Sequence, residues 1–168
     1  MKTNSQKLVL FFFFLLSVIG WSQTKAGSPA ESVTGNINGA TITIKYGSPS
    51  VKGRAIWGAL VPFEQVWRAG ANDATTFVTD KTISIEGKQL PAGSYSFFII
   101  PSKKQSIIIF NKVAKQWGSY DYKAASDQLR VTVDNQKSDN LIEKLEYRIL
   151  KTRIELAWEN WIIGFEVK

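Results

Sequence analysis

Apolar and polar residues alternate with a period of two along much of the chain after residue 39. Between residues 40 and 46, isoleucine or tyrosine occupies the even positions from 42 onward, and threonine or lysine occupies the odd ones. The same period returns at 129–134 and at 153–159. Such alternation is typical of β-strands that bury one face and expose the other.

Shorter apolar runs between turn residues add further strands to this prediction. The additional predicted strands are 74–79, 82–86, 89–90, 94–100, 106–111, 142–150 and 161–167. Gly87-Lys88 separates two of them as a hairpin signal. The runs 94–100 and 106–111 are apolar on both faces, so we expect them at the centre of a sheet that is covered on both sides.

The connections complete the fold prediction. Residues 117–127 lack a strand period and are interpreted as a long connection, and residues 135–140 as a polar turn. No long amphipathic helix is indicated. The pattern therefore predicts one all-β domain over residues 40–168, an antiparallel β-sandwich or flattened barrel of about eight or nine short strands.

The first 22 residues differ from the rest of the chain. Lys2 and Lys7 precede an almost unbroken apolar run from Leu8 to Gly20, and Gly20 and Ser22 suit a cleavage site before Gln23. These features indicate a signal peptide over residues 1–22, with an uncleaved anchor as the weaker alternative. We then expect a flexible lead-in over residues 23–39 and an exported protein, periplasmic or extracellular, that is soluble and has no integral membrane segment after cleavage.

Composition excludes several kinds of chemistry. The chain contains no cysteine and no histidine, so thiol sites, histidine-based metal sites and Ser-His-Asp triads cannot form within it. The net charge is +7, and it falls to +5, from 19 basic and 14 acidic residues, without Lys2 and Lys7. These charges are scattered rather than clustered, which argues against a nucleic-acid partner. We expect no cofactor and no metal.

Residues 46–76 break the strand pattern with a high density of glycine, proline, arginine and tryptophan. Guanidinium groups suit carboxylate or phosphate ligands, glycine allows close backbone approach, and indole rings can wall a pocket. The candidate ligand-binding residues are Lys52, Arg54, Trp57, Trp67, Arg68, Asn72, Asp73 and Thr75. The expected ligand is a small anion or a sugar, and an envelope protein is an alternative partner.

Motifs within this stretch carry a resemblance to a known family. They are Tyr46, Ser48–Ser50, Lys52–Arg54, Trp57-Gly58, Val61–Phe63, Trp67-Arg68, Gly70–Asn72 and Thr75-Thr76, continued downstream by Gly87-Lys88, Leu90–Tyr95, Ile100-Pro101, Asn111-Lys112 and Trp117-Gly118. Together they resemble the exported domain of unknown function 2911, common in Bacteroidota. The resemblance implies export and a β-rich fold, and it implies no established chemistry. Ser48, where the family more often has arginine, and Asp73, where it more often has glutamate, depart from the pattern.

Alternative interpretations of residues 46–76 remain open. Arg68 could pair with Asp73 or Glu64 simply to hold the loop, and Trp67 could be a core residue. A hydrolase acting on a cell-envelope glycan or ester would use Glu64 or Asp73 as acid or base. Exposed aromatics offer a third, carbohydrate-binding interpretation, for which the candidates are Trp57, Trp117, Tyr120 and Tyr122. We favour a non-enzymatic binding module without catalytic residues.

Overall fold

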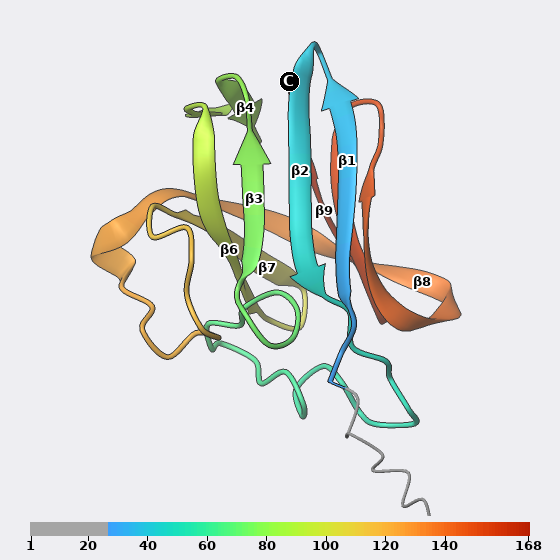
Figure 1. Cartoon of the computed structure of the whole chain (residues 1–168). Helices are drawn as coiled ribbons and strands as arrows, with labels where there is room; N and C mark the ends of the chain where they lie inside the picture. The colour runs from blue at the N-terminus through green and yellow to red at the C-terminus, as the bar shows by residue number, and fades with distance from the viewer. Residues whose placement is uncertain (1–26) are drawn as a thin grey trace, which may run out of the picture.

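The computed structural model describes residues 27–168, which form an all-β fold as predicted (Figure 1). Seven strands pair antiparallel in the order β1-β2-β3-β6-β7-β8-β9. Their bounds are β1 (Ala30–Ile37), β2 (Ala40–Gly47), β3 (Thr75–Thr79), β6 (Gly93–Pro101), β7 (Gln105–Asn111), β8 (Asp127–Ile149) and β9 (Arg153–Glu166). β4 (Ile83–Ile85) and β5 (Lys88–Leu90) form a separate hairpin. Within the described part, the one helical element is a 3₁₀ turn, Ala124–Ser126.

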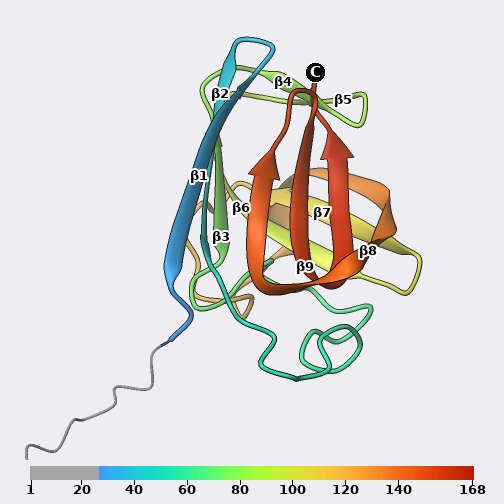
Figure 2. The same cartoon turned by 90° about the vertical axis from the view of Figure 1, so that its right-hand side faces the viewer.

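The large sheet curls into a half-barrel rather than splitting into two stacked sheets (Figure 2). The longest strand, β8, pairs with β7 through its first part and with β9 through the remainder. The curl brings β1 against the last part of β8, where a Cβ atom on Gly35 would lie 2.6 Å from Cγ2 of Ile149. Glycine therefore allows the close approach of these two strands.

The predicted flexible lead-in over residues 23–39 is wrong for residues 30–37, which form the edge strand β1. Ile37 is buried and Val33 is half-buried, whereas the residues between them are small or polar. The β1–β2 connection is Asn38-Gly39, with φ angles of 51° and 81°. Two successive positive φ angles suit a tight hairpin turn, for which Asn-Gly is the strongest sequence signal. The predicted signal peptide lies outside the described residues.

The predicted polar turn at 135–140 is also wrong, because this segment continues β8. The β8–β9 register shifts between Lys137 and Ile142 and again between Ile142 and Glu146. Extra residues on one strand bend it without ending the pairing. The polar side chains therefore belong to a bent strand, and the strands predicted at 153–159 and 161–167 are one strand, β9.

The main core lies inside the curl, and a smaller one lies on its outer face. The inner core contains Ile42, Ile44, Leu156 and Trp158, as the alternation predicted. On the outer face, Phe98 and Ile109 are completely buried beneath the connection that includes Tyr122. The prediction that 94–100 and 106–111 form a sheet centre covered on both sides is confirmed.

Two features close the ends of the half-barrel. The β4–β5 hairpin lies at one end, joined to the end of the chain through two backbone hydrogen bonds between Ser84 and Lys168 (Figure 2). The loop of residues 48–74 lies at the other end (Figure 1). This loop places Val51, Ile56 and Val61 in the inner core. No helix within residues 27–168 has the length and apolar character needed to cross a membrane.

Candidate functional site

The two ends of the loop of residues 48–74 meet where the backbone at Ala71 crosses the backbone at Gly47. The Ala71 N–H donates to the Gly47 carbonyl at 3.1 Å. A Cβ atom on Gly47 would lie 2.2 Å from the Ala71 carbonyl oxygen, so no side chain fits there. The crossing therefore requires glycine and fixes the position of residues 70–72.

The last part of the loop is held by hydrogen bonds to buried groups. The Ala69 carbonyl accepts the hydroxyl of Thr75 at 3.0 Å and that of Tyr147 at 2.8 Å. Trp67 exchanges two backbone hydrogen bonds with Ile99, of 2.8 and 2.9 Å. Trp67 is 9% exposed and Thr75 is completely buried. These contacts fix the backbone on both sides of Arg68.

Four tryptophan side chains gather beneath the loop. Trp57 stacks on Trp161 with ring centroids 4.7 Å apart, and Trp67 stacks on Trp158 at 6.0 Å. Trp57 and Trp67 meet edge to face at 5.7 Å. Stacked and edge-to-face geometries are the favoured ones for aromatic rings. Trp158 and Trp161 come from β9, far from the loop in sequence.

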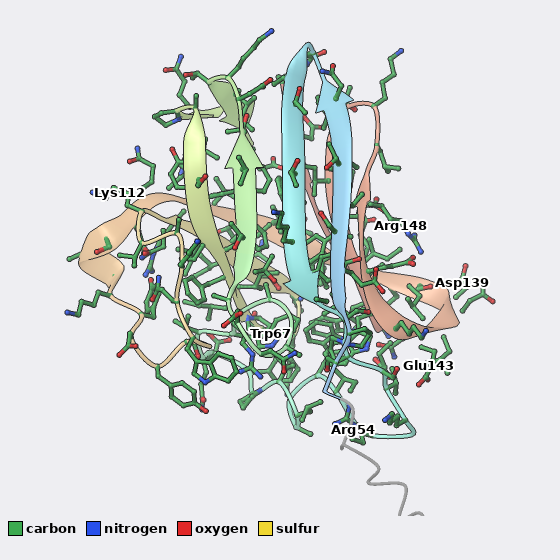
Figure 3. The ribbon with its side chains drawn as sticks, in the orientation of Figure 1. Arg54, Trp67, Lys112, Asp139, Glu143 and Arg148 are labelled. Atoms are coloured by element: carbon green, nitrogen blue, oxygen red, sulfur yellow. The ribbon has the colours of Figure 1, made fainter. Side chains whose placement is uncertain are left out.

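A tight turn at residues 51–54 contains Lys52 and presents Arg54 at this end of the molecule, where Figure 3 labels it. Lys52 and Gly53 both have positive φ angles, 49° and 67°, and the Arg54 N–H donates to the Val51 carbonyl at 3.1 Å. The Arg54 guanidinium is oriented by backbone carbonyls: its Nε donates to Val51 at 3.0 Å and its Nη2 to Ser50 at 2.5 Å.

We call the cavity beside this turn the end groove. It has a volume of about 620 Å³, within the range of small-molecule sites. Its lining is Gly27, Ser28, Pro29, Ser48, Pro49, Ser50, Lys52, Arg54, Leu60, Val61, Trp67, Arg68, Gly70, Ala71, Asn72 and Trp158. Three of these residues are cationic and none carries a carboxylate. The end groove is therefore electropositive and partly walled by indole rings.

Arg68 does not pair with an acid in the described part of the chain. The ion pairs formed by residues 27–168 include neither the expected Asp73 nor Glu64 as its partner. Its Nε is buried and has no hydrogen-bond partner. The indole Nε1 of Trp158, another residue of the end groove, is likewise buried and unpartnered. Unsatisfied buried donors are uncommon because each costs about 1–3 kcal/mol.

A second cavity, the face groove, lies on the outer face of β1, β2 and β3. Its volume is about 810 Å³. Its lining is Ala30, Glu31, Ser32, Lys45, Tyr46, Gly47, Ala71, Asn72, Asp73, Ala74, Thr76, Lys115, Gln116 and Trp117. Two residues are basic and two are acidic, so this lining has no formal net charge. Ala71 and Asn72 belong to both grooves.

The structure divides the predicted binding residues among three places. Those that line the end groove are Lys52, Arg54, Trp67, Arg68 and Asn72. Asn72 and Asp73 line the face groove. Trp57 and Thr75 line neither and contact the interior of the loop instead. A ligand-binding role for these residues remains a prediction.

Sequence reasoning missed several residues of both grooves. Trp158 follows from strand alternation as a core residue, but no local signal joins it to the loop. The β2–β3 register places Lys45 beside Thr76, whereas Gln116 comes from the β7–β8 connection and is held there by hydrogen bonds to Ser96 and Asn111. Within residues 27–168, no group of three or more Asp or Glu side chains is arranged to hold a metal ion.

A curled antiparallel half-barrel, with an arginine- and tryptophan-bearing loop across one end, defines the structural class of this protein. The chain belongs to the family described as protein of unknown function (DUF2911), whose family model matches residues 28–167. The match includes all of the face groove and all of the end groove except Gly27, and it confirms the family indicated by the motifs of residues 46–76. No curated protein and no solved structure matches the chain.

Proposed function

We propose that this protein is an exported, non-enzymatic module that binds a small ligand carrying a carboxylate or phosphate group in the end groove. The observation that carries the proposal is the cationic lining of this groove, in which Arg68 has a buried Nε without a partner. Export is supported by the signal-peptide features of residues 1–22.

The chemistry of the groove favours an oxyanion. Arg54 is already oriented by two carbonyls, so it loses little side-chain freedom when a ligand binds. Arg68 offers a planar fork of N–H donors that matches carboxylate and phosphate oxygens. A buried donor without a partner gains a full hydrogen bond from such a ligand without giving one up. The Trp67 and Trp158 rings provide an apolar wall for the rest of the molecule.

The hydrolase alternative gains no specific support from the geometry. Glu64 is exposed and lines neither groove, and Asp73 lines the face groove, away from the cationic lining. It therefore stays a prediction made from sequence alone.

Ligand titrations of the mature protein test the proposal. Inorganic phosphate, citrate and phenyl phosphate are titrated at constant ionic strength, and binding is followed by tryptophan fluorescence and by melting temperature. We expect at least one of them to bind and to raise the melting temperature. Arg68→Gln is expected to weaken binding at least about tenfold, equivalent to about 1.4 kcal/mol.

Lys112→Gln is the matched control, because it removes one positive charge from an exposed residue that lies away from Arg54 (Figure 3). It should leave anion affinity unchanged. Arg68→Lys keeps the charge but loses the fork, so an intermediate affinity is expected. The proposal is contradicted if none of the three anions binds, or if Arg68→Gln and Lys112→Gln have the same effect.

A further inference from the structure

The face groove has a chemistry of its own that the anion site does not explain. Directly paired residues form a polar row across the outer face of the sheet. They are Ser32, Lys45, Thr76, Ser96 and Asn111. Gln116 covers Ser96 and Asn111, which are completely buried, whereas Lys45 and Thr76 line the open groove.

Trp117 is displayed at the edge of this groove on a fixed backbone. Its side chain is 63% exposed, although tryptophan is usually much more buried. The segment is tied to the sheet through a bridge between Asp73 and Trp117 and through the Ala74 N–H, which donates to the Gln116 carbonyl at 3.0 Å. The backbone that carries the exposed indole is therefore held at one place beside the polar groups of the groove.

Gln116 supplies a second, independent indication of a ligand. Its Nε2 lies 2.9 Å from the Ser96 hydroxyl oxygen, 3.2 Å from Asn111 Oδ1 and 3.0 Å from the Val113 carbonyl. The last two atoms are acceptors, which fixes the orientation of the amide. Its Oε1 is buried and accepts no hydrogen bond from the protein. Gln116 lines the groove, and its side chain thus carries an acceptor that no protein group in the described chain satisfies.

The charges in the groove balance. Lys45 and Lys115 offset Glu31 and Asp73, so donors and acceptors are interspersed without net charge. A hydroxyl group both donates and accepts a hydrogen bond, and it suits such a mixed lining better than an anion does. The C–H faces of a pyranose ring are apolar and can cover an exposed indole.

We propose that the face groove binds a neutral glycan, with one pyranose ring against Trp117 and its hydroxyl groups on the mixed polar lining beside it. This site is independent of the anion site, since only Ala71 and Asn72 line both grooves. The ligand class is an uncharged oligosaccharide of hexoses.

Titration of ¹⁵N-labelled protein with maltohexaose, cellohexaose and laminarihexaose tests this proposal. The indole N–H resonance of Trp117, assigned by its loss in Trp117→Ala, is expected to shift in a saturable manner with at least one of them. Trp117→Ala should weaken that binding at least about tenfold. Thr76→Val, which replaces a hydroxyl group of the groove by a methyl group, should weaken it by a smaller factor.

Tyr120→Ala is the matched control, because Tyr120 is 83% exposed in the same connection and does not line the groove. It should bind the oligosaccharide as the wild type does. Arg68→Gln should also bind it normally, which separates a failure of this proposal from a failure of the anion site. The proposal is overturned if none of the oligosaccharides shifts the Trp117 resonance, if Trp117→Ala retains wild-type affinity, or if Trp117 responds to phosphate instead.

Discussion

The end groove and the face groove share a wall at Ala71 and Asn72, yet they differ in charge and in how their aromatic side chains are held. In the end groove, Trp67 and Trp158 are core residues that also line the cavity. In the face groove, Trp117 is exposed and contributes little to the core. The comparison shows that one loop crossing separates a cationic groove, partly walled by core residues, from a groove without net charge on the sheet surface.

The largest expected difference between the two grooves is the contribution of their tryptophan side chains to the free energy of unfolding. Trp158→Ala removes a side chain that is 1% exposed and contacts two other tryptophans, so we expect a loss of about 3–5 kcal/mol in the free energy of unfolding. Trp117→Ala should change it by less than about 0.5 kcal/mol. Urea denaturation of both variants measures the difference. Equal losses would mean that the two grooves do not differ in their relation to the core.

The shared wall can be disturbed at Gly47. Gly47→Ala places a Cβ atom against the Ala71 carbonyl, and the resulting shift should cost about 1–3 kcal/mol of stability. Because residues 70–72 would move, both phosphate and oligosaccharide binding should weaken in this variant. Gly53→Ala is the informative comparison: its Cβ would meet no atom within 4 Å, so its cost comes from the positive φ of 67° and is confined to the turn on the end-groove side. A loss confined to one ligand in Gly47→Ala would show that the wall is not shared.

Alkaline pH should lower the stability of the fold through Tyr147, which lies beneath the end groove. Burial raises the pKa of Tyr147 well above its usual value, and its hydroxyl donates to the Ala69 carbonyl beneath the end groove. Tyr147 thus stabilises the fold fully below the unfolded-state pKa of about 10, and this contribution is lost as pH rises toward the folded-state value. The melting temperature should fall less steeply above pH of about 10 in Tyr147→Phe than in the wild type.

Tyr122, in the connection that includes Trp117, should contribute a smaller alkaline loss of stability than Tyr147 does. Burial, then the neighbouring Asp127, raises the pKa of Tyr122 to about 12. Its hydroxyl donates to Asp127 at 2.7 Å and accepts from Arg130. Tyr122→Phe should therefore also flatten the alkaline decline, by less than Tyr147→Phe because Tyr122 is only half-buried. Identical pH profiles for the wild type and both variants would contradict this account.

The fold was largely predictable from the sequence because strand formation leaves a local pattern. Alternation located β2 and β9 from residues such as Ile44 and Leu156, and both are buried. It failed at β1, where Gly35 replaces an apolar residue because Ile149 occupies that space. It failed again at residues 135–140, where a bend within β8 exposes polar side chains much as a turn does.

The site was only partly predictable, for a different physical reason. The glycines and arginines of residues 46–76 identified the loop, and Arg54 and Arg68 do line one groove. Trp158 reaches the end groove through the curl of the sheet, and Gln116 reaches the face groove through hydrogen bonds between its connection and Ser96, Asn111 and Ala74, so both depend on contacts between distant parts of the chain. The absence of an acid beside Arg68 in the described chain also depends on loop geometry that local sequence does not determine.

The most direct test of the central claim is phosphate affinity in the wild type and in Arg68→Gln, measured at constant ionic strength alongside oligosaccharide affinity. The account predicts that Arg68→Gln weakens phosphate binding at least about tenfold while oligosaccharide binding and melting temperature stay near wild-type values. Undiminished phosphate binding by Arg68→Gln would contradict it.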